Sequence, residues 1–221
     1  MMMLKKVTYK EQVYNYLKEE IIKGNLVPGE IYSEQIFADQ LQISRTPVRE
    51  AILQLKSEGL VEIFNNRGIG IRAISLDELQ QILQARTAIE GFSIRYLAEK
   101  IHTPEGQRTQ TALQQCLDQT EALSQDMNHH YEYMKADVNF HRIIVEFTRN
   151  KFFIRLIDQM RTRMEQATVN SLTLKNRHID ALKEHQKIFR CICAGNGDDA
   201  VKAYRDHMAI TMDILKKTGL V

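Results

Sequence analysis

The chain has 221 residues, 43% of them hydrophobic and 26% charged, a balance that is ordinary for a folded globular protein. Disorder as the main state is therefore excluded, and the length allows two modest cores. The net charge of +2 is evenly spread along the chain. The first 74 residues carry ten Lys and Arg against nine Asp and Glu, and the remaining residues carry twenty Lys and Arg against nineteen Asp and Glu. Any DNA-binding function must therefore be argued from where the charges lie.

Neither a secretory leader nor a membrane span is predicted. Residues 1–10 mix apolar residues with three lysines, and no later apolar run approaches the length of a span. The chain has three cysteines, and all of them fall in predicted helices. An odd number of cysteines in helices is a poor framework for disulfide bonds. We therefore expect a cytoplasmic protein with reduced thiols and no membrane partner.

The first third of the chain has the pattern of three helices followed by a hairpin. Apolar residues recur at helical spacing before a turn at Pro28, and Ser33 and Ser44 are good first residues for two further helices. After Gly59, two apolar runs flank a turn of Asn and Gly residues. The predicted elements are helices at residues 13–22, 33–41 and 44–59 and strands at residues 60–64 and 69–74. This order predicts a winged helix-turn-helix domain over residues 1–74.

The third predicted helix has two different faces. One is apolar at helical spacing, and the other presents Arg45, Thr46 and Arg49 at the helix start, the end that enters the DNA major groove in helix-turn-helix proteins. Arginine suits this place because its planar fork bonds guanine or clamps a phosphate. The apolar face consists of Val48, Ala51, Ile52 and Leu55. A single arginine at such a position is more often a solvated surface residue, but the joint placement of the arginines on a helix-turn-helix and hairpin favours DNA binding.

Two further groups extend the predicted DNA-binding surface. Asn66, Arg67 and Gly68 form the predicted tip of the hairpin, from which an arginine can reach the minor groove or the backbone. Ser33 marks the start of the second helix, where free backbone N–H groups can receive a phosphate.

Residues 33–61 resemble the GntR family of transcription regulators, most specifically in the run SRTPVREA at residues 44–51. The resemblance implies that Arg45, Thr46 and Arg49 contact bases or phosphates and that residues 66–68 lie at the wing tip. The chain departs from the common pattern at two positions. Gln35 stands where many relatives carry a basic residue, and Gln42 stands where many carry a turn glycine. We therefore expect Gln42 to adopt a backbone conformation that is less favourable for it than for glycine.

Beyond Ser75 the sequence shows only helical periodicity interrupted by short caps. The predicted helices cover residues 76–101, 104–127, 130–149, 151–169, 175–194 and 197–218. We therefore predict a mainly α protein, in which residues 75–221 form an antiparallel bundle of about six helices.

Four polar residues of the predicted bundle could share one interior position. Asp137 and His141 lie one helical turn apart, and His185 and His207 lie within apolar stripes of the last two helices. The alternatives are a polar patch or a simple Asp–His hydrogen bond. The other histidines fall near helix ends, where we expect them in solvent; they are His102, His129, His130 and His178.

The second part of the chain resembles the FCD ligand-binding domain of FadR-type GntR regulators. The matching pieces are RTAIE at residues 86–90, DVNFH at 137–141, EH at 184–185 and RDH at 205–207. The resemblance implies that Asp137, His141, His185 and His207 bind a divalent transition metal. Zinc is our first choice, and nickel, manganese or iron would suit the same ligands.

The same resemblance implies a small carboxylate effector. Arg86 is the predicted second anchor for its carboxylate, beside the metal. The alternative for Arg86 is an ion pair with Glu90, four residues later. Arg161 and Arg163 are weaker candidates for the anchor.

These features together predict a homodimeric transcription repressor that binds a pseudo-palindromic DNA operator, with an organic acid controlling the affinity. One alternative is a regulator for which the metal itself is the signal. Another is a metalloenzyme, which we disfavour because no general base lies near the predicted ligands and an enzyme would not need the first domain.

Overall fold

The structure is a computed structural model that describes residues 7–65, 67–125, 129–172, 174 and 176–218. The chain divides into two compact units, Met1–Ala73 and Ile74–Val221, here called the N-terminal and C-terminal units. Among the described helices, none combines the length and the apolar content needed to cross a bilayer.

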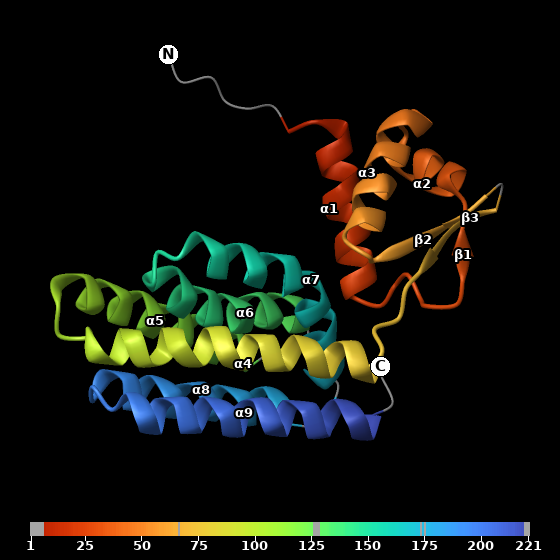
Figure 1. Cartoon of the computed structure of the whole chain (residues 1–221). Helices are drawn as coiled ribbons and strands as arrows, with labels where there is room; N and C mark the ends of the chain where they lie inside the picture. Colours follow the sequence, from red (N-terminus) through yellow and green to blue (C-terminus); the bar gives the residue numbers. More distant parts are fainter. Residues whose placement is uncertain (1–6, 66, 126–128, 173, 175, 219–221) are drawn as a thin grey trace, which may run out of the picture. The chain divides into compact units, whose positions relative to one another are not determined.

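The N-terminal unit contains the predicted three helices and hairpin, together with one short strand that was not predicted (Figure 1). That strand pairs with β3, so the sheet order is β1-β3-β2 with antiparallel neighbours. The elements are α1 (Tyr9–Ile22), β1 (Ile31–Tyr32), α2 (Glu34–Leu41), α3 (Arg45–Ser57), β2 (Val61–Phe64) and β3 (Gly68–Ile71). The winged helix-turn-helix fold is confirmed.

The core of this unit is built on the apolar face of α3. The predicted stripe of Val48, Ala51, Ile52 and Leu55 is completely buried, as is Leu17 of α1. Burying such a stripe fixes the rotation of the helix, because its opposite face must then point to solvent. Packing in the core therefore determines which side chains α3 presents outward.

The turn between α2 and α3 depends on an unusual backbone conformation. Gln42 ends α2 in the left-handed region, with φ 52° and ψ 45°. The expectation that this residue adopts a less comfortable conformation than glycine is confirmed, since side chains other than Gly, Asn and Asp rarely enter this region.

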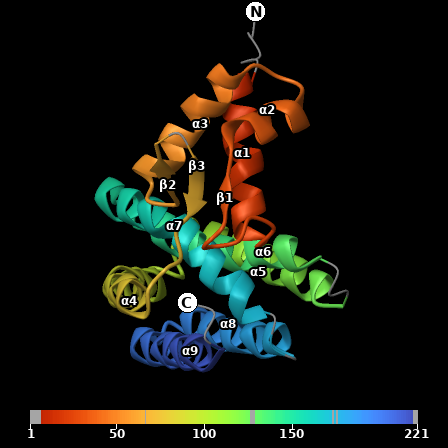
Figure 2. The same cartoon turned by 90° about the vertical axis from the view of Figure 1, so that its right-hand side faces the viewer.

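The C-terminal unit consists of six helices in its described part, as the sequence predicted (Figure 2). They are α4 (Leu76–Glu99), α5 (Pro104–Leu123), α6 (His130–Phe147), α7 (Lys151–Leu172), α8 (Arg177–Cys193) and α9 (Gly197–Thr218). Ser75 caps α4 by accepting a hydrogen bond from the Glu78 amide, and Thr103 caps α5 in the same way through Gly106. The six helices therefore begin and end within a few residues of their predicted bounds.

Helix α4 carries charge into the middle of the bundle. It packs against α6, α8 and α9, and its buried residues include Arg86 and Glu90 as well as aliphatic side chains. Buried charges are stable only when they are paired, so their partners identify a polar site inside the bundle.

Candidate metal centre and DNA-binding surface

The start of α3 presents the three predicted contact residues to solvent. Arg45, Thr46 and Arg49 are all exposed, on the side opposite the buried stripe. A guanidinium nitrogen of Arg45 lies 3.4 Å from a carboxylate oxygen of Glu34 in α2, yet 63% of the Arg45 side chain remains exposed. Both arginines are therefore accessible to a phosphate or a base edge.

The other predicted DNA-binding residues lie at the hairpin and at the start of α2. Arg67 is exposed in the turn between β2 and β3, whereas Asn66 lies outside the described residues. Gly68 has φ 127°, and a Cβ there would collide with the Tyr32 carbonyl. The Ser33 hydroxyl caps α2 by accepting from the Ile36 amide, 3.3 Å away. Gly68 and Ser33 thus shape the backbone of this surface.

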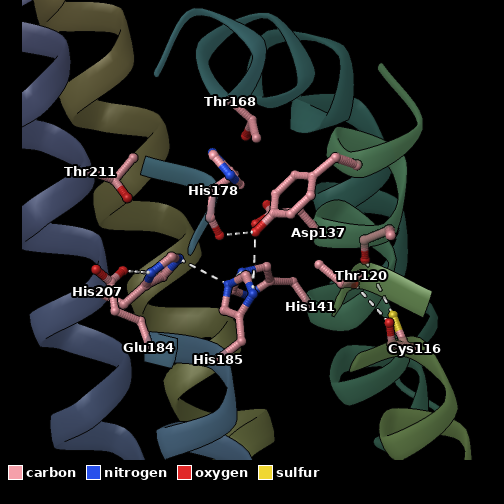
Figure 3. A network of polar contacts seen from close by, with 12 residues as sticks. Cys116, Thr120, Asp137, His141, Thr168, His178, Glu184, His185, His207 and Thr211 are labelled. Carbon is pink, nitrogen blue, oxygen red and sulfur yellow. Dashed lines mark hydrogen bonds and ion pairs between the residues drawn. The ribbon is translucent and has the colours of Figure 1, made fainter. Parts of the chain in front are cut away.

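Three imidazoles from three helices meet inside the C-terminal unit (Figure 3). The Nε2 atom of His185 lies 3.0 Å from Nε2 of His141 and 3.3 Å from Nε2 of His207. All three residues are at most 4% exposed, and their potential ligand atoms lie within 4.8 Å of one another. Residues from α6, α8 and α9, far apart in sequence, therefore form one buried group of nitrogen donors.

Asp137, the fourth predicted ligand, lies next to this group. It is buried one turn before His141 in α6, and its Oδ1 atom is 3.7 Å from Nδ1 of His185. Asp137 therefore lies beside the His185 ring, and its role as a ligand remains a prediction.

Two glutamates that sequence reasoning did not assign to the site hold the outer imidazoles. Oε2 of Glu90 lies 2.8 Å from Nδ1 of His141, and Oε2 of Glu184 lies 2.5 Å from Nδ1 of His207. Glu184 precedes a predicted ligand directly, but its contact is with the histidine of another helix. Only the packing of α8 against α9 reveals that contact.

Each of these glutamates is in turn paired with an arginine. Nε of Arg86 lies 2.5 Å from Oε1 of Glu90, and Arg177 donates to both carboxylate oxygens of Glu184 at 2.8 and 3.0 Å. The predicted alternative for Arg86, an ion pair with Glu90, is therefore present. It is buried, with Arg86 only 8% exposed.

These contacts set the protonation states of the site. Burial raises the pKa of the Glu90 carboxyl, but Arg86 and His141 outweigh burial and lower the pKa to about 2. Burial lowers the pKa of His207 and holds the pKa of His185 well below its usual value. Ionised carboxylates and neutral imidazoles are the forms that a metal site requires.

The donor set fits a cation. Nδ1 of His207 bonds the Glu184 carboxylate, so the neutral ring keeps a lone pair on Nε2 and directs it at His185. Nε2 of His141 approaches the same His185 nitrogen, which carries one proton at most and cannot donate to both neighbours. Two nitrogens bound to one tetrahedral Zn²⁺ at about 2.0–2.1 Å lie roughly 3.3 Å apart, close to the observed separations.

A small cavity adjoins the site between α4, α6 and α7. Its volume is about 30 Å³, room for one or two water molecules. The charged residues that line it are Arg86, Glu90, Asp137, His141, Arg142, Asp158 and Arg161. Arg163, in contrast, is buried 3.4 Å from a carboxylate oxygen of Glu78 and does not line the cavity.

One histidine expected in solvent is buried. His178 is 6% exposed, and its backbone carbonyl accepts a hydrogen bond from the Tyr133 hydroxyl. The prediction was wrong because position near a helix end does not determine exposure; here Tyr133 of α6 packs edge-on against the His178 ring.

Comparisons with known proteins cover both units. The FCD domain matches residues 81–209, and the bacterial regulatory proteins of the gntR family match residues 9–71. The HTH-type regulator YdhC of Bacillus subtilis is 25% identical over 96% of this chain and 93% of its own length. The HTH-type repressor RspR of Escherichia coli is 26% identical over 90% of this chain and 85% of its own.

A solved structure has the same fold over nearly the whole chain. A GntR-type transcriptional regulator from Rhodococcus sp. RHA1 superposes with a TM-score of 0.78, at 20% identity, covering 94% of this chain and 97% of that one. The matched families and relatives are transcription regulators, not enzymes. An FCD domain over more than half of the chain and a gntR domain before it show that the protein belongs to the GntR family of DNA-binding transcription regulators, in the group with an FCD effector-binding domain.

Proposed function

We propose that the protein is a dimeric repressor whose affinity for DNA is controlled by a small organic acid bound beside a divalent metal. The observation that carries this proposal is the convergence of three buried imidazole nitrogens next to a cavity lined by arginines. In this proposal residues 1–74 bind the operator and residues 75–221 bind the metal and the effector.

The proposed ligands are His141, His185, His207 and Asp137. Three imidazoles and a carboxylate suit zinc, our first choice, and also nickel, manganese or iron. The bound ion would supply a Lewis-acidic centre with open positions for a carboxylate oxygen. Arg86 of α4 would face the second oxygen of the effector's carboxylate, and Arg161 of α7 lines the same cavity.

Effector binding requires the cavity to change shape. A volume of about 30 Å³ is too small for an organic acid of several carbons, and α7 forms one wall through Ile157, Met160 and Met164. We infer that the effector displaces α7, and this displacement is the structural signal. A ligand shifts such an equilibrium only through its different affinities for the two states, typically by about 1–3 kcal/mol.

The outer surface of the same helix carries an apolar patch. On α7, Phe152 is 74% exposed and Leu156 is 46% exposed. Phe92 of α4 is 54% exposed and packs edge-on against Phe153 of α7. Exposed aromatic residues that cluster in this way are typical of protein interfaces. We propose that these four residues, the aromatic patch, form the centre of the dimer interface. A shift of α7 would then change the spacing of the two DNA-binding units.

Replacing Phe152 with glutamate is expected to dissociate the dimer. Both subunits of a twofold dimer carry the substitution, so the interface would bury two introduced charges. Loss of a central aromatic residue costs about 2–4 kcal/mol, and the dimer dissociation constant should therefore rise by 100-fold or more. Analytical ultracentrifugation measures the change. The matched control is Ile210→Glu on α9, which is 42% exposed but outside the patch. Wild-type sedimentation of Phe152→Glu, or equal dissociation of the control, would contradict this interface.

The test of the whole function is a thermal-shift screen of mono- and dicarboxylic acids of two to six carbons on Zn²⁺-loaded protein. An acid at 100 times its dissociation constant should stabilise the protein by about 2.7 kcal/mol. The same acid should change operator affinity by roughly 5–150-fold in fluorescence anisotropy, using an operator selected from random DNA. Chelated protein is the control and should lose both effects.

Two other results would decide against this function. If no acid in the panel shifts either the melting temperature or the operator affinity, the effector proposal fails. If operator affinity follows Zn²⁺ concentration without any acid, the metal itself is the signal.

A further inference from the structure

We propose that Glu184, held in place by Arg177, is a positioning residue of the metal centre that fixes the His207 ring with its Nε2 lone pair directed at the ion. This inference rests on the proposed metal centre and names residues outside its ligand set. It concerns the side of the centre away from Arg86 and the effector cavity, since none of these three residues lines that cavity.

The contacts of Glu184 leave one orientation for the His207 ring. Oε2 of Glu184 lies 2.5 Å from Nδ1 of His207, while Nε2 of the same ring lies 3.3 Å from Nε2 of His185 (Figure 3). An ionised carboxylate only accepts hydrogen bonds, so Nδ1 must carry the proton. The tautomer of His207 and the direction of its free lone pair are therefore both set by Glu184.

Arg177 holds the Glu184 carboxylate in place. The guanidinium binds both carboxylate oxygens and donates a further hydrogen bond of 3.3 Å to Thr211, one turn after His207 in α9. Arg177 is itself only 5% exposed, so its fork is held by packing as well as by hydrogen bonds.

The arrangement recurs on the other side of the centre. Arg86, Glu90 and His141 make the same sequence of contacts as Arg177, Glu184 and His207, with the glutamate between a guanidinium and an Nδ1 atom. Each ion pair lies within one helix, α4 or α8, and an ion pair of that kind would need no histidine at its end. In both cases the carboxylate contacts Nδ1 of a histidine whose Nε2 atom belongs to the converging group. We infer that the two carboxylates serve to orient these imidazoles.

The test compares Zn²⁺ affinity of Glu184→Gln with wild type, by competition with a fluorescent chelator on the full-length protein. Loss of a carboxylate that orients a ligand typically weakens metal binding 10–100-fold, and we expect a loss in this range. The matched control is Glu146→Gln, because Glu146 also pairs with an arginine, Arg142, at 2.8 Å but contacts no histidine of the centre. The absorption spectrum of the Co²⁺-loaded variant should also change.

A second measurement does not depend on a variant that folds. Nitrogen-15 NMR of histidine-labelled wild-type protein should show His207 protonated at Nδ1, with and without Zn²⁺. Protonation at Nε2 in the metal-free protein would overturn the proposal, and so would wild-type Zn²⁺ affinity in Glu184→Gln. Wild-type protein that binds neither Zn²⁺ nor Co²⁺ would overturn the metal centre itself and this inference with it.

Discussion

Replacing His185 with alanine is expected to lower the affinity for Zn²⁺ by more than 100-fold. Its Nε2 atom lies between those of His141 and His207, and the residue is fully buried. Structural Zn²⁺ sites with four ligands bind with about 10–16 kcal/mol, so removing one ligand should cost about 3 kcal/mol or more. Elemental analysis after dialysis and chelator competition would measure the stoichiometry and the affinity.

The control for this experiment lies on the same helix. His178 is also buried on α8, at 6% exposure, but it does not belong to the group of converging imidazoles. His178→Ala should therefore retain one Zn²⁺ per chain at close to wild-type affinity. Full retention of the ion by His185→Ala would remove that residue from the site, and equal loss in both variants would indicate general damage to the bundle.

Replacing Arg45 and Arg49 together with alanine is expected to weaken operator binding by about 30-fold or more. Both side chains are exposed at the start of α3, and an arginine that reads a base contributes about 1–3 kcal/mol. The stripe beneath them is unchanged, so the fold of the N-terminal unit should persist. Fluorescence anisotropy on operator and on random DNA, at several salt concentrations, would measure the loss.

The two DNAs separate base reading from phosphate contact. A base contact makes the loss larger on the operator, whereas a phosphate contact weakens both DNAs equally and reduces the salt dependence. Lys56→Ala, in the last turn of the same helix, is the control and should bind nearly as wild type. Unchanged operator affinity in the double variant would exclude the start of α3 as the recognition surface.

The sequence predicts those elements that local chemistry determines. The stripe of α3, the cap at Ser75 and the six helices of the bundle all follow from helical periodicity and from residues that accept backbone hydrogen bonds. Strand β1 was not predicted because two residues, Ile31 and Tyr32, are too few for any alternation to show; the strand exists because β3 pairs with it.

The site was predictable only in part for a related reason. Periodicity identified His185 and His207 as inward-facing, but it does not tell which residue of a neighbouring helix lies opposite. The contacts of Glu90 with His141 and of Glu184 with His207 depend on the relative rotation and height of packed helices. Charged residues such as these are ordinarily assigned to the surface, and only their partners reveal that they are buried.

The two series of paired residues in the bundle have an evolutionary consequence. Losing one member of a buried ion pair leaves the other charge without a partner, at a cost of about 3–5 kcal/mol, a large share of the stability of most domains. Arg177 and Glu184, or Arg86 and Glu90, can therefore be exchanged for apolar residues only in concert. A lineage that loses either ion pair would have to change both of its residues together, so we expect each pair to be retained or lost as a unit.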